Sequence, residues 1–332
     1  MKVMVTGGAG YIGSHCVLAL LKKNHDVIIV DNLSTGHKET VDTLKKYGNV
    51  DFYESDLRKP EEIQKPFDDN KDVGAVMHFA AYSQVGESVK DPQKYYMNNV
   101  YGSLNLLNQM IKHGVDKIVF SSTAATYGNP ITDTIDETHP QNPINPYGHT
   151  KLTIEKIMDN YREPYGIRSA RLRYFNVAGA DSQGRVGEWH DPETHLIPNV
   201  LKAAVKEESF PLFGTDYDTP DGTCIRDYIN VEDLADAHVL ALDYLDKGGE
   251  TDFFNLGTKT GNSVKEVVDV CEEVTGKKIK PDIRERRAGD PSKLVANNEK
   301  AKKVLGWQPK RDLKYSVQTA YNWEKSRTNN QS

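Results

Sequence analysis

The chain begins with Met1-Lys-Val-Met-Val-Thr-Gly-Gly-Ala-Gly-Tyr-Ile-Gly-Ser-His15, which predicts a strand over residues 3–6, a glycine turn and a helix over residues 11–21. Gly7 and Gly10 allow a tight turn and a close approach of the backbone to a pyrophosphate, and Gly13 lets the helix pack on the strand. The first helical residues, Tyr11 and Ile12, carry N–H groups that have no partner inside a helix, so the helix start can bind phosphates. The stretch therefore predicts a unit that binds a dinucleotide.

Asp31 indicates which dinucleotide it is. It follows a predicted strand at residues 27–30 and stands 18 residues after Gly13. A carboxylate in this place can accept hydrogen bonds from both ribose hydroxyls of NAD and would repel the 2′-phosphate of NADP. No arginine follows it, since the next residues are Asn32 and Leu33. A lone GxxGxxG turn can occur without a ligand, but together with Asp31 it predicts NAD as the cofactor.

A second motif, Tyr147-Gly-His-Thr-Lys151, indicates proton chemistry. A helix that begins after Asn145 and Pro146 would place the phenol and the ammonium on one face. The pKa of a free tyrosine is about 10, and a nearby ammonium and a positive nicotinamide ring would both favour the phenolate. The same spacing is common in ordinary surface helices. Because a strand ending in Ser121-Ser-Thr123 precedes it, we interpret Tyr147 as the base that removes a proton from an alcohol.

Short β-branched runs alternate with longer helical patterns through the first 176 residues. The runs lie at residues 3–6, 27–30, 50–53, 75–79, 117–120 and 167–174. This alternation predicts an α/β fold, a Rossmann-type doubly wound parallel sheet whose strands are buried on both faces. Residues 1–176 are expected to form an NAD-binding domain that also carries Tyr147 and Lys151.

From about residue 177 the sequence becomes richer in Pro, Gly and Asp, and helical patterns recur at residues 196–205, 231–246, 264–275 and 313–323. Residues 177–328 are expected to form a smaller C-terminal α/β domain that mainly binds substrate at the carboxyl ends of the sheet strands. The chain is expected to cross back to the first domain around residues 225–260. Residues 329–332 are expected to be a loose tail.

The composition argues against several classes of protein. The net charge of −6 disfavours a nucleic-acid partner, and no run approaches the roughly 20 apolar residues that span a membrane. The strand predicted at the start of the chain leaves no room for a signal peptide. The three cysteines, Cys16, Cys224 and Cys271, are odd in number and far apart. They predict reduced thiols in the cytoplasm, with neither a disulfide nor a metal site.

As a set, these motifs resemble those of the extended short-chain dehydrogenase/reductases, in particular the members that invert C4 of UDP-hexoses. The similarity extends from Val3 to about Trp323. It rests on Thr6-Gly-Gly-Ala-Gly-Tyr-Ile-Gly-Ser-His15, Asp31-Asn-Leu33, Asp56-Leu57, His78-Phe-Ala-Ala81, Val85-Gly-Glu-Ser-Val89, Asn98-Asn-Val100, Tyr147-Gly-His-Thr-Lys151, Arg173-Tyr-Phe-Asn176, Arg226-Asp-Tyr228 and Arg286-Arg-Ala-Gly-Asp290. The resemblance implies an NAD-dependent isomerase of galactose metabolism that interconverts UDP-galactose and UDP-glucose as a cytoplasmic homodimer.

The resemblance also implies a role for individual residues. Thr123, Tyr147 and Lys151 would be catalytic. Besides the glycine turn, NAD would contact Asp31, Asn32, Asp56, Leu57, Phe79, Ala80, Ala81, Asn98, Ser121, Tyr147, Lys151 and Tyr174. The UDP-sugar would contact Thr123, Tyr147, Asn176, His195, Leu196, Phe213, Arg226, Tyr228, Arg287, Asp290 and Leu294. Among these, Arg226 and Arg287 would hold the pyrophosphate.

The reaction implied by the resemblance moves a hydride from C4 to NAD⁺ while Tyr147 takes the hydroxyl proton. The 4-keto sugar then turns about its pyrophosphate, and the hydride returns to the opposite face. Leu294 stands where some relatives restricted to UDP-glucose and UDP-galactose have a tyrosine. Because leucine leaves more room for an N-acetyl group, we also expect turnover of UDP-GlcNAc and UDP-GalNAc.

Three alternative functions share this fold. A sugar-nucleotide 4,6-dehydratase needs an acid and a base, typically Asp-Glu directly after the Thr, whereas this chain has Thr123-Ala-Ala-Thr-Tyr127. A UDP-glucuronate decarboxylase usually has a Glu in the same segment. A non-catalytic redox-sensing protein would keep the fold but tends to lose the Tyr/Lys pair, which is present here.

The homodimer has two candidate interface segments, the helices expected near residues 93–112 and 147–161. Packing of these helices on the sheet is the alternative explanation of their apolar faces.

Overall fold

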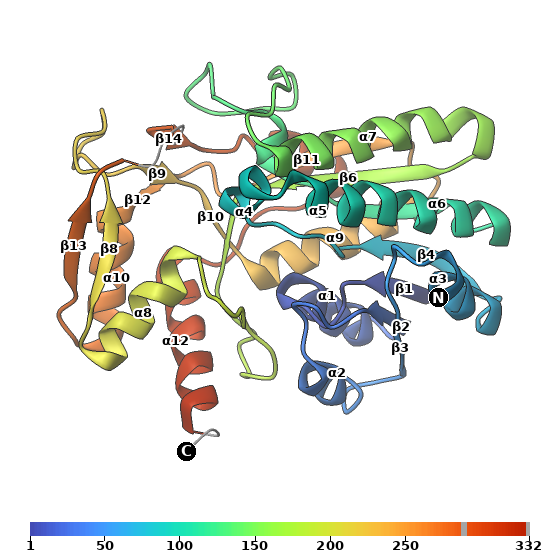
Figure 1. The fold of residues 1–332 in the computed structure, drawn as a ribbon, viewed down its shortest axis with the longest axis horizontal. Coiled ribbons are helices and arrows are strands. Elements are labelled where there is room, and N and C mark those ends of the chain that lie inside the picture. Colours follow the sequence, from blue (N-terminus) through green and yellow to red (C-terminus); the bar gives the residue numbers. More distant parts are fainter. Residues whose placement is uncertain (287–290, 330–332) are drawn as a thin grey trace.

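A seven-stranded parallel sheet forms the centre of the computed structural model, which describes residues 1–286 and 291–329 (Figure 1). The strands follow the spatial order β11-β6-β5-β4-β1-β2-β3, and every pairing between neighbours is parallel. This order confirms the predicted doubly wound sheet. The strand bounds are Lys2–Thr6 (β1), Asp26–Asp31 (β2), Val50–Glu54 (β3), Val73–His78 (β4), Lys117–Ser121 (β5), Arg168–Tyr174 (β6) and Asp252–Leu256 (β11).

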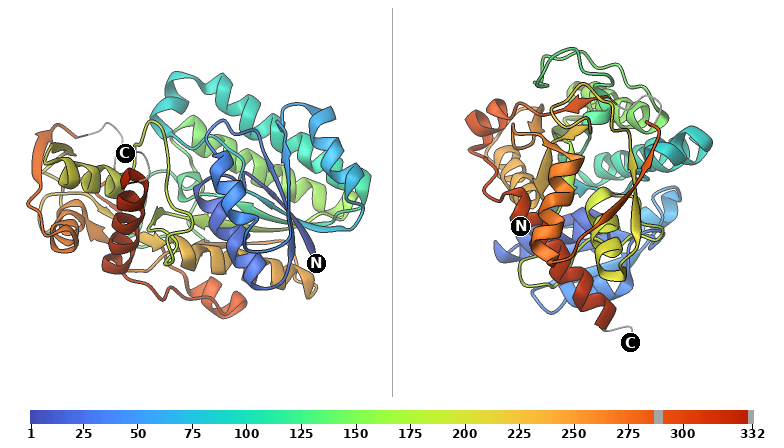
Figure 2. Two further views of the ribbon diagram at one scale, coloured as in Figure 1. Left: turned by 90° about the horizontal axis from the view of Figure 1, so that it is seen from below. Right: turned by 90° about the vertical axis from the view of Figure 1, so that its left-hand side faces the viewer.

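Successive side chains of the strands enter two different cores, as expected for strands covered on both faces. Val3 and Val5 of β1 lie in one core, and Met4 between them lies in the other. Figure 2 shows helices on both sides of the sheet. The first core receives α1 (Tyr11–Lys22), α2 (Lys38–Leu44) and α9 (Val231–Asp246), and the second receives α3 (Pro60–Asp69), α6 (Gly102–His113) and α7 (Pro146–Tyr165).

The chain leaves the sheet after β6 and returns to it with α9 and β11. Asp252 of β11 lies opposite Ala170 of β6, and Leu256 lies opposite Tyr174. An ion pair between Lys23 and Asp243 (3.0 Å) joins the end of α1 to α9. The sheet is therefore completed by a strand that lies 78 positions after the end of β6.

A third core lies beside the sheet, at the left of Figure 1. Its elements are α8 (Leu196–Lys206), α10 (Val264–Thr275), α12 (Leu313–Asn329) and β8 (Ser209–Phe213), which pairs in parallel with β13 (Lys280–Arg284). Helix α12 includes Asn329, so the tail boundary predicted at residue 329 falls on the last residue of a helix.

Short strands form two further small sheets. β7 (Asn176–Ala178) pairs with β10 (Tyr228–Asn230), and β9 (Ile225–Arg226) lies between β12 (Asn262–Ser263) and β14 (Lys293–Leu294). Helix α11 (Glu299–Leu305) also contributes to the first core. No helix in the described part of the chain is long and apolar enough to cross a membrane.

Candidate active site

The glycine turn joins β1 to α1 at the carboxyl end of the sheet. Gly7 has a φ of +75°, which side chains rarely adopt, and a Cβ there would lie 2.6 Å from the backbone nitrogen of Ala80. A Cβ at Gly13 would lie 2.1 Å from the carbonyl oxygen of Gly7, so glycine is required for α1 to start this close to the turn. The N-cap residue is Gly10, which has no side chain to accept the first helical N–H groups. These N–H groups can therefore bind phosphates.

Asp31 lies beside this turn at the end of β2. Its Oδ2 accepts a hydrogen bond from the N–H of Ala9 (3.0 Å), and its Oδ1 accepts one from the N–H of Leu33 (2.9 Å). Burial raises the pKa of this carboxyl, and the two N–H groups partly oppose the rise. Each oxygen keeps a further lone pair for a ribose hydroxyl. A helix start without a cap next to such a carboxylate fits the predicted dinucleotide.

The residues predicted near the adenine are Asp56 and Leu57, which follow β3. Arg58 binds its carboxylate with Nη2 at 2.5 Å from Oδ2 and Nε at 3.0 Å from Oδ1. This guanidinium is the main cause that lowers the pKa of Asp56 to about 2, and Asn32 also donates to the carboxylate. Leu57 is buried, and its carbonyl oxygen accepts a hydrogen bond from Asn105 Nδ2 (2.9 Å). Arg58 is not among the predicted site residues, although its place two residues after Asp56 was a usable signal.

The loop after β4 carries Phe79, Ala80 and Ala81. The N–H groups of Phe79 and Ala80 both donate to the carbonyl oxygen of Thr6, at 2.9 and 3.1 Å. These bonds hold the loop against the end of β1, where the glycine turn begins. The three residues are half-buried, which leaves part of their surface for a cofactor.

Asn98 lies in a π-helical turn, η1 (Tyr96–Tyr101), which follows α4 (Val85–Lys90) and α5 (Pro92–Tyr95). π-helical turns occur frequently at functional sites. The neighbouring Asn99, for which the sequence predicts no role, is fully buried. It donates to the carbonyl oxygen of Tyr82 (3.0 Å) and to Thr150 Oγ1 (3.1 Å), and accepts from the N–H of Tyr82. Asn99 thus ties the loop after β4 to α7.

Helix α7 begins where the sequence predicts. Asn145 is its N-cap and accepts a hydrogen bond from the N–H of Gly148 (2.9 Å), and Pro146 is the first helical residue. Thr123 follows β5 and caps a short 3₁₀ helix, η2 (Ala124–Thr126). A Cβ at Gly148 would lie 2.5 Å from the carbonyl oxygen of Ala125. This close approach of α7 to η2 brings Tyr147 within hydrogen-bond reach of Thr123.

The sequence predicts a lowered pKa for Tyr147, whereas in the structure this pKa is raised. Burial raises the pKa of Tyr147 to about 12, and the hydrogen bond with Thr123 opposes only part of the rise. Burial also lowers the pKa of Lys151 to about 7. Lys151 Nζ donates to the carbonyl oxygen of Ser121 (2.8 Å). In the protein alone, Lys151 therefore does not shift Tyr147 toward phenolate, because its own charge is easily lost near neutral pH.

Ser121 and Tyr174 come from the neighbouring strands β5 and β6. Ser121 Oγ and the phenol of Tyr174 are hydrogen-bonded to each other. Burial raises the pKa of Tyr174, and a nearby Tyr147 adds to the rise. The two predicted cofactor contacts therefore lie together, next to the phenol of Tyr147.

A buried ion pair fixes α7 to the sheet. Glu155 accepts hydrogen bonds from Arg173 of β6, with Nη2 at 2.5 Å and Nε at 3.0 Å, and from Ser122 Oγ at 2.5 Å. The side chains of Arg173 and Glu155 are only 2% and 1% exposed. Because Glu155 lies one helical turn after Lys151, this pair positions the part of α7 that carries the reacting side chains.

Four of the residues predicted to contact a UDP-sugar lie in adjacent short strands. Arg226 of β9 lies opposite Leu294 of β14, and Asn176 of β7 lies opposite Tyr228 of β10. Asp227 joins these two pairs along the chain, and its carbonyl oxygen accepts a hydrogen bond from the N–H of Asn176 (3.0 Å). Arg226 and Tyr228 are buried, whereas Leu294 and Asn176 are half-buried.

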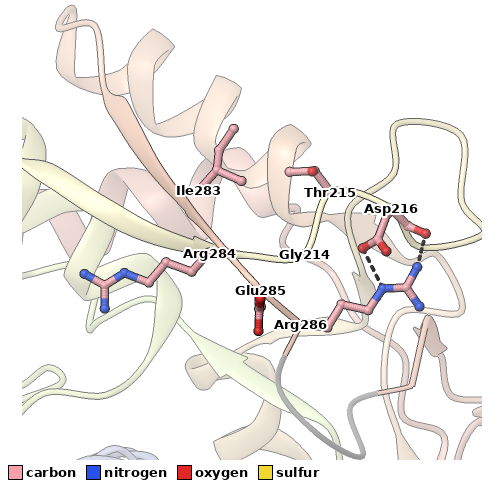
Figure 3. A pocket seen from close by; sticks show the side chains of 7 residues that line it. All are labelled: Gly214, Thr215, Asp216, Ile283, Arg284, Glu285 and Arg286. Atoms are coloured by element: carbon pink, nitrogen blue, oxygen red, sulfur yellow. Dashed lines mark hydrogen bonds and ion pairs between the residues drawn. The ribbon is translucent and has the colours of Figure 1, made fainter.

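Phe213 lies at the end of β8, opposite Arg284 of β13. A surface pocket of about 590 Å³ lies next to it and is lined by Gly214, Thr215, Asp216, Ile283, Arg284, Glu285 and Arg286 (Figure 3). Arg286 points toward Asp216 and donates from Nε to Oδ1 (2.6 Å). The two other predicted contacts, Arg287 and Asp290, lie outside the described residues.

His195 and Leu196 lie at the start of α8, as the N-cap and the first helical residue. His195 Nδ1 lies 2.7 Å from Glu188 Oε1 and 3.0 Å from Glu193 Oε1. The imidazole of His195 thus faces two carboxylates of the preceding loop.

Comparison with known proteins identifies relatives over nearly the whole chain. Residues 3–257 match the NAD dependent epimerase/dehydratase family. The UDP-glucose 4-epimerase of Halalkalibacterium halodurans is 52% identical over 327 residues, which cover 98% of this chain and 96% of that protein.

Solved structures of similar proteins also match nearly the whole chain. The UDP-glucose 4-epimerase from Brucella ovis in complex with NAD matches 97% of both chains, with 45% identity and a TM-score of 0.92. The UDP-Glc/GlcNAc 4-epimerase from Campylobacter jejuni matches 98% of this chain and 99% of that chain, with 42% identity and a TM-score of 0.85.

Proposed function

The chain belongs to the NAD dependent epimerase/dehydratase family, and from this we propose that it interconverts UDP-galactose and UDP-glucose by inverting C4 of the hexose, with NAD as cofactor. One observation carries the proposal: Tyr147 reaches Thr123 at the end of β5, beside Lys151. Relatives that are about half identical over nearly their whole length support the same reaction.

Each reacting side chain has a distinct task. Bound NAD supplies the hydride acceptor and, when reduced, the hydride donor. Thr123 orients the C4 hydroxyl toward Tyr147, and the Tyr147 phenolate takes the hydroxyl proton and later returns it. Lys151, when protonated, favours that phenolate. Burial of Tyr147 keeps water away from the proton in transit.

The segment after Thr123 argues against the dehydratase alternative. Ala124 and Ala125 form the start of η2, and neither side chain can donate or accept a proton. The intact Tyr147 and Lys151 argue against a sensor without catalysis.

We assign NAD binding to residues 1–176 and UDP-sugar binding mainly to residues 177–328. Arg226 and Arg287 would grip the pyrophosphate, with Asn176, Leu196, Phe213 and Tyr228 around the nucleotide. A firm hold on the nucleotide and few fixed contacts to the sugar would let the 4-keto sugar turn over between the two hydride transfers.

A second substrate class is proposed from the place of Leu294. This half-buried leucine lies opposite Arg226, so it would stand near the sugar if Arg226 holds the phosphates. Leucine leaves space for an N-acetyl group, and the similar Campylobacter jejuni enzyme is a UDP-Glc/GlcNAc 4-epimerase. We therefore extend the proposed substrates to UDP-GlcNAc and UDP-GalNAc.

A cytoplasmic homodimer completes the proposal. In the described part of the chain the three cysteines form no disulfide, which suits a reducing compartment. Large apolar side chains are exposed along α4 and η1, where a second copy could cover them, namely Val85, Val89, Tyr96, Met97 and Tyr101.

The deciding experiment incubates purified protein with UDP-galactose and no added NAD, and separates the products by chromatography. We expect UDP-glucose to form until the two sugars reach a constant ratio, which would show epimerisation with retained cofactor. If no UDP-glucose forms even after NAD is supplied, the proposed reaction is wrong.

A further inference from the structure

Four side chains converge in residues 188–195, the loop that leads into α8. Glu188, His190, Glu193 and His195 each offer one ligand atom, and these four atoms lie within 4.8 Å of one another. Along the sequence they follow the spacing Glu-x-His-x-x-Glu-x-His. Two imidazole nitrogens and two carboxylate oxygens are ligands that divalent transition metals bind.

Each of the two imidazoles lies within 3.5 Å of both carboxylates. Glu188 Oε1 lies 2.7 Å from His195 Nδ1 and 3.4 Å from His190 Nδ1. The carboxylate of Glu193 lies 3.0 Å from His195 Nδ1 and 3.5 Å from His190 Nδ1. Metal–ligand bonds of about 2.0–2.2 Å in a regular tetrahedron place the ligands about 3.3–3.6 Å apart. Small side-chain shifts would therefore complete the coordination.

Two of the four ligand atoms are buried without a hydrogen-bond partner, namely Glu188 Oε1 and His190 Nδ1. Glu188 is only 7% exposed. His195 Nδ1 bonds Glu193 Oε1 (3.0 Å) and also lies 2.7 Å from Glu188 Oε1, which is an ion-pair distance when the imidazole is protonated. A histidine that binds a metal is neutral, so in the metal-binding state the buried carboxylates need another positive partner, and a cation between the four groups supplies it.

Neighbouring elements hold the loop in place. Trp323 Nε1 of α12 donates to the carbonyl oxygen of Glu188 (2.9 Å). Trp189 stacks on His37, with ring centroids 3.6 Å apart. Tyr11, the first residue of α1, meets the ring of His190 edge-on at 6.3 Å. Ligands that are already oriented lose little freedom when an ion binds.

We propose that Glu188, His190, Glu193 and His195 bind one divalent transition-metal ion, and that Zn²⁺ is the ion this set suits best. Four protein ligands leave no position open for substrate on the ion, so the role of the ion is structural. The ion would use Nδ1 of His195, which leaves Nε2 for the UDP-sugar contact that the resemblance implies. It would fix the loop between Tyr11 at the glycine turn and the start of α8. The sequence expectation of no metal site rests on the cysteines and overlooks this histidine–glutamate spacing.

The test uses the purified enzyme with its bound NAD. A chelator is added and removed, Zn²⁺ is supplied, and the metal that stays with the protein after gel filtration is measured by mass spectrometry. We expect one ion per chain and a higher melting temperature than in the chelated protein. With Co²⁺ instead, we expect the intense visible absorption of a tetrahedral site.

Variants identify the ligands. We expect His190→Gln and Glu193→Gln each to weaken Zn²⁺ binding at least about 100-fold, and the control His25→Gln, whose ring lies near the N-terminus, to bind as the wild type does. NAD content and elution volume show that each variant is folded. The proposal is overturned if the chelated wild type takes up no Zn²⁺, or if folded His190→Gln takes up as much as the wild type.

Discussion

The phenol of Tyr147 is a weak acid because it is buried. Burial raises the pKa of Tyr147 to about 12, so the phenol is protonated at neutral pH in the protein alone. A shift down to about 7 corresponds to about 7 kcal/mol, and it must come from positive charge close to the phenol. Lys151 can supply part of that charge. Its pKa is about 7, so the phenolate of Tyr147, once formed, would favour the protonated amine.

Removal of the phenol tests this role. We expect Tyr147→Phe to lower kcat for UDP-galactose about 10³-fold or more, because the C4 hydroxyl proton then has no acceptor. Thr123→Val should lower kcat less, by about 10- to 100-fold, since it removes an orienting hydrogen bond. The control Tyr161→Phe, on the same helix, should keep full activity. Substantial activity of Tyr147→Phe with its NAD retained would contradict the assignment.

Leu294 is the residue on which the proposed range of substrates depends. We expect Leu294→Tyr to reduce kcat/KM for UDP-GlcNAc at least about tenfold, since the ring fills the space an N-acetyl group would need. Turnover of UDP-galactose should change little. The control Leu294→Met keeps the volume of the side chain and should leave both activities intact. If wild-type protein shows no turnover of UDP-GlcNAc, the wider substrate range is wrong.

At the scale of elements, α7 depends on one buried charge pair. We expect Glu155→Gln to lower the free energy of unfolding by about 3–5 kcal/mol, because it leaves the Arg173 guanidinium buried without a negative partner. The double variant Glu155→Leu/Arg173→Met should regain most of that loss, since no unpaired charge remains. Urea unfolding of all three proteins measures this. A loss below about 1 kcal/mol in Glu155→Gln would show that the pair does not anchor the helix.

The periodic elements follow from the sequence, and the aperiodic ones do not. The four helices predicted in the second half begin at Leu196, Val231, Val264 and Leu313, as observed. Strand β11 is not predicted, because Asp252-Phe-Phe-Asn-Leu256 is short and partly polar. It becomes a strand by pairing with the exposed edge of β6, which is a tertiary contact. The π-helical turn at 96–101 likewise has no pattern of its own.

The candidate active site, too, can be predicted only in part from the sequence. The glycine turn and Asp31 can be located from spacing, because the chemistry of a phosphate and a ribose fixes the residue types. The contact between Tyr147 and Thr123 needs the approach of α7 to η2, and the high pKa of Tyr147 needs its burial. Neither follows from sequence separation, since both depend on packing between elements that are distant in the chain.

At the scale of the whole molecule, buried neutral histidines should make the fold sensitive to acid. Burial lowers the pKa of His78 to about 3 and that of His238 to about 4. The unfolded chain, with histidine pKa values of about 6.5, therefore binds more protons between these values. Stability is then present above pH 6.5 and is lost as the pH falls below it.

His78 provides the test, because it bonds Thr6 Oγ1 (2.7 Å) and Ser103 Oγ (2.8 Å) deep in the sheet. Between pH 7 and pH 5 we expect His78 to account for up to about 2 kcal/mol of the lost stability. His78→Gln should reduce the loss by that amount in urea unfolding at the two pH values. The exposed His149→Gln should not, and an equal loss in both variants would refute the prediction.

The late return of β11 has a consequence for how the protein is made. Eighty-two residues separate the end of β6 at Tyr174 from the end of β11 at Leu256. At about 5–20 residues per second, a ribosome needs about 4–16 s to supply them. During that interval the edge of β6 that will pair with β11 is unpaired and can pair with other polypeptide chains. We therefore expect chains that stop before residue 252 to aggregate and chains that extend past residue 256 to do so less, which pelleting of translation products can measure. Completion of the sheet would then depend on the timing of synthesis as well as on its equilibrium stability.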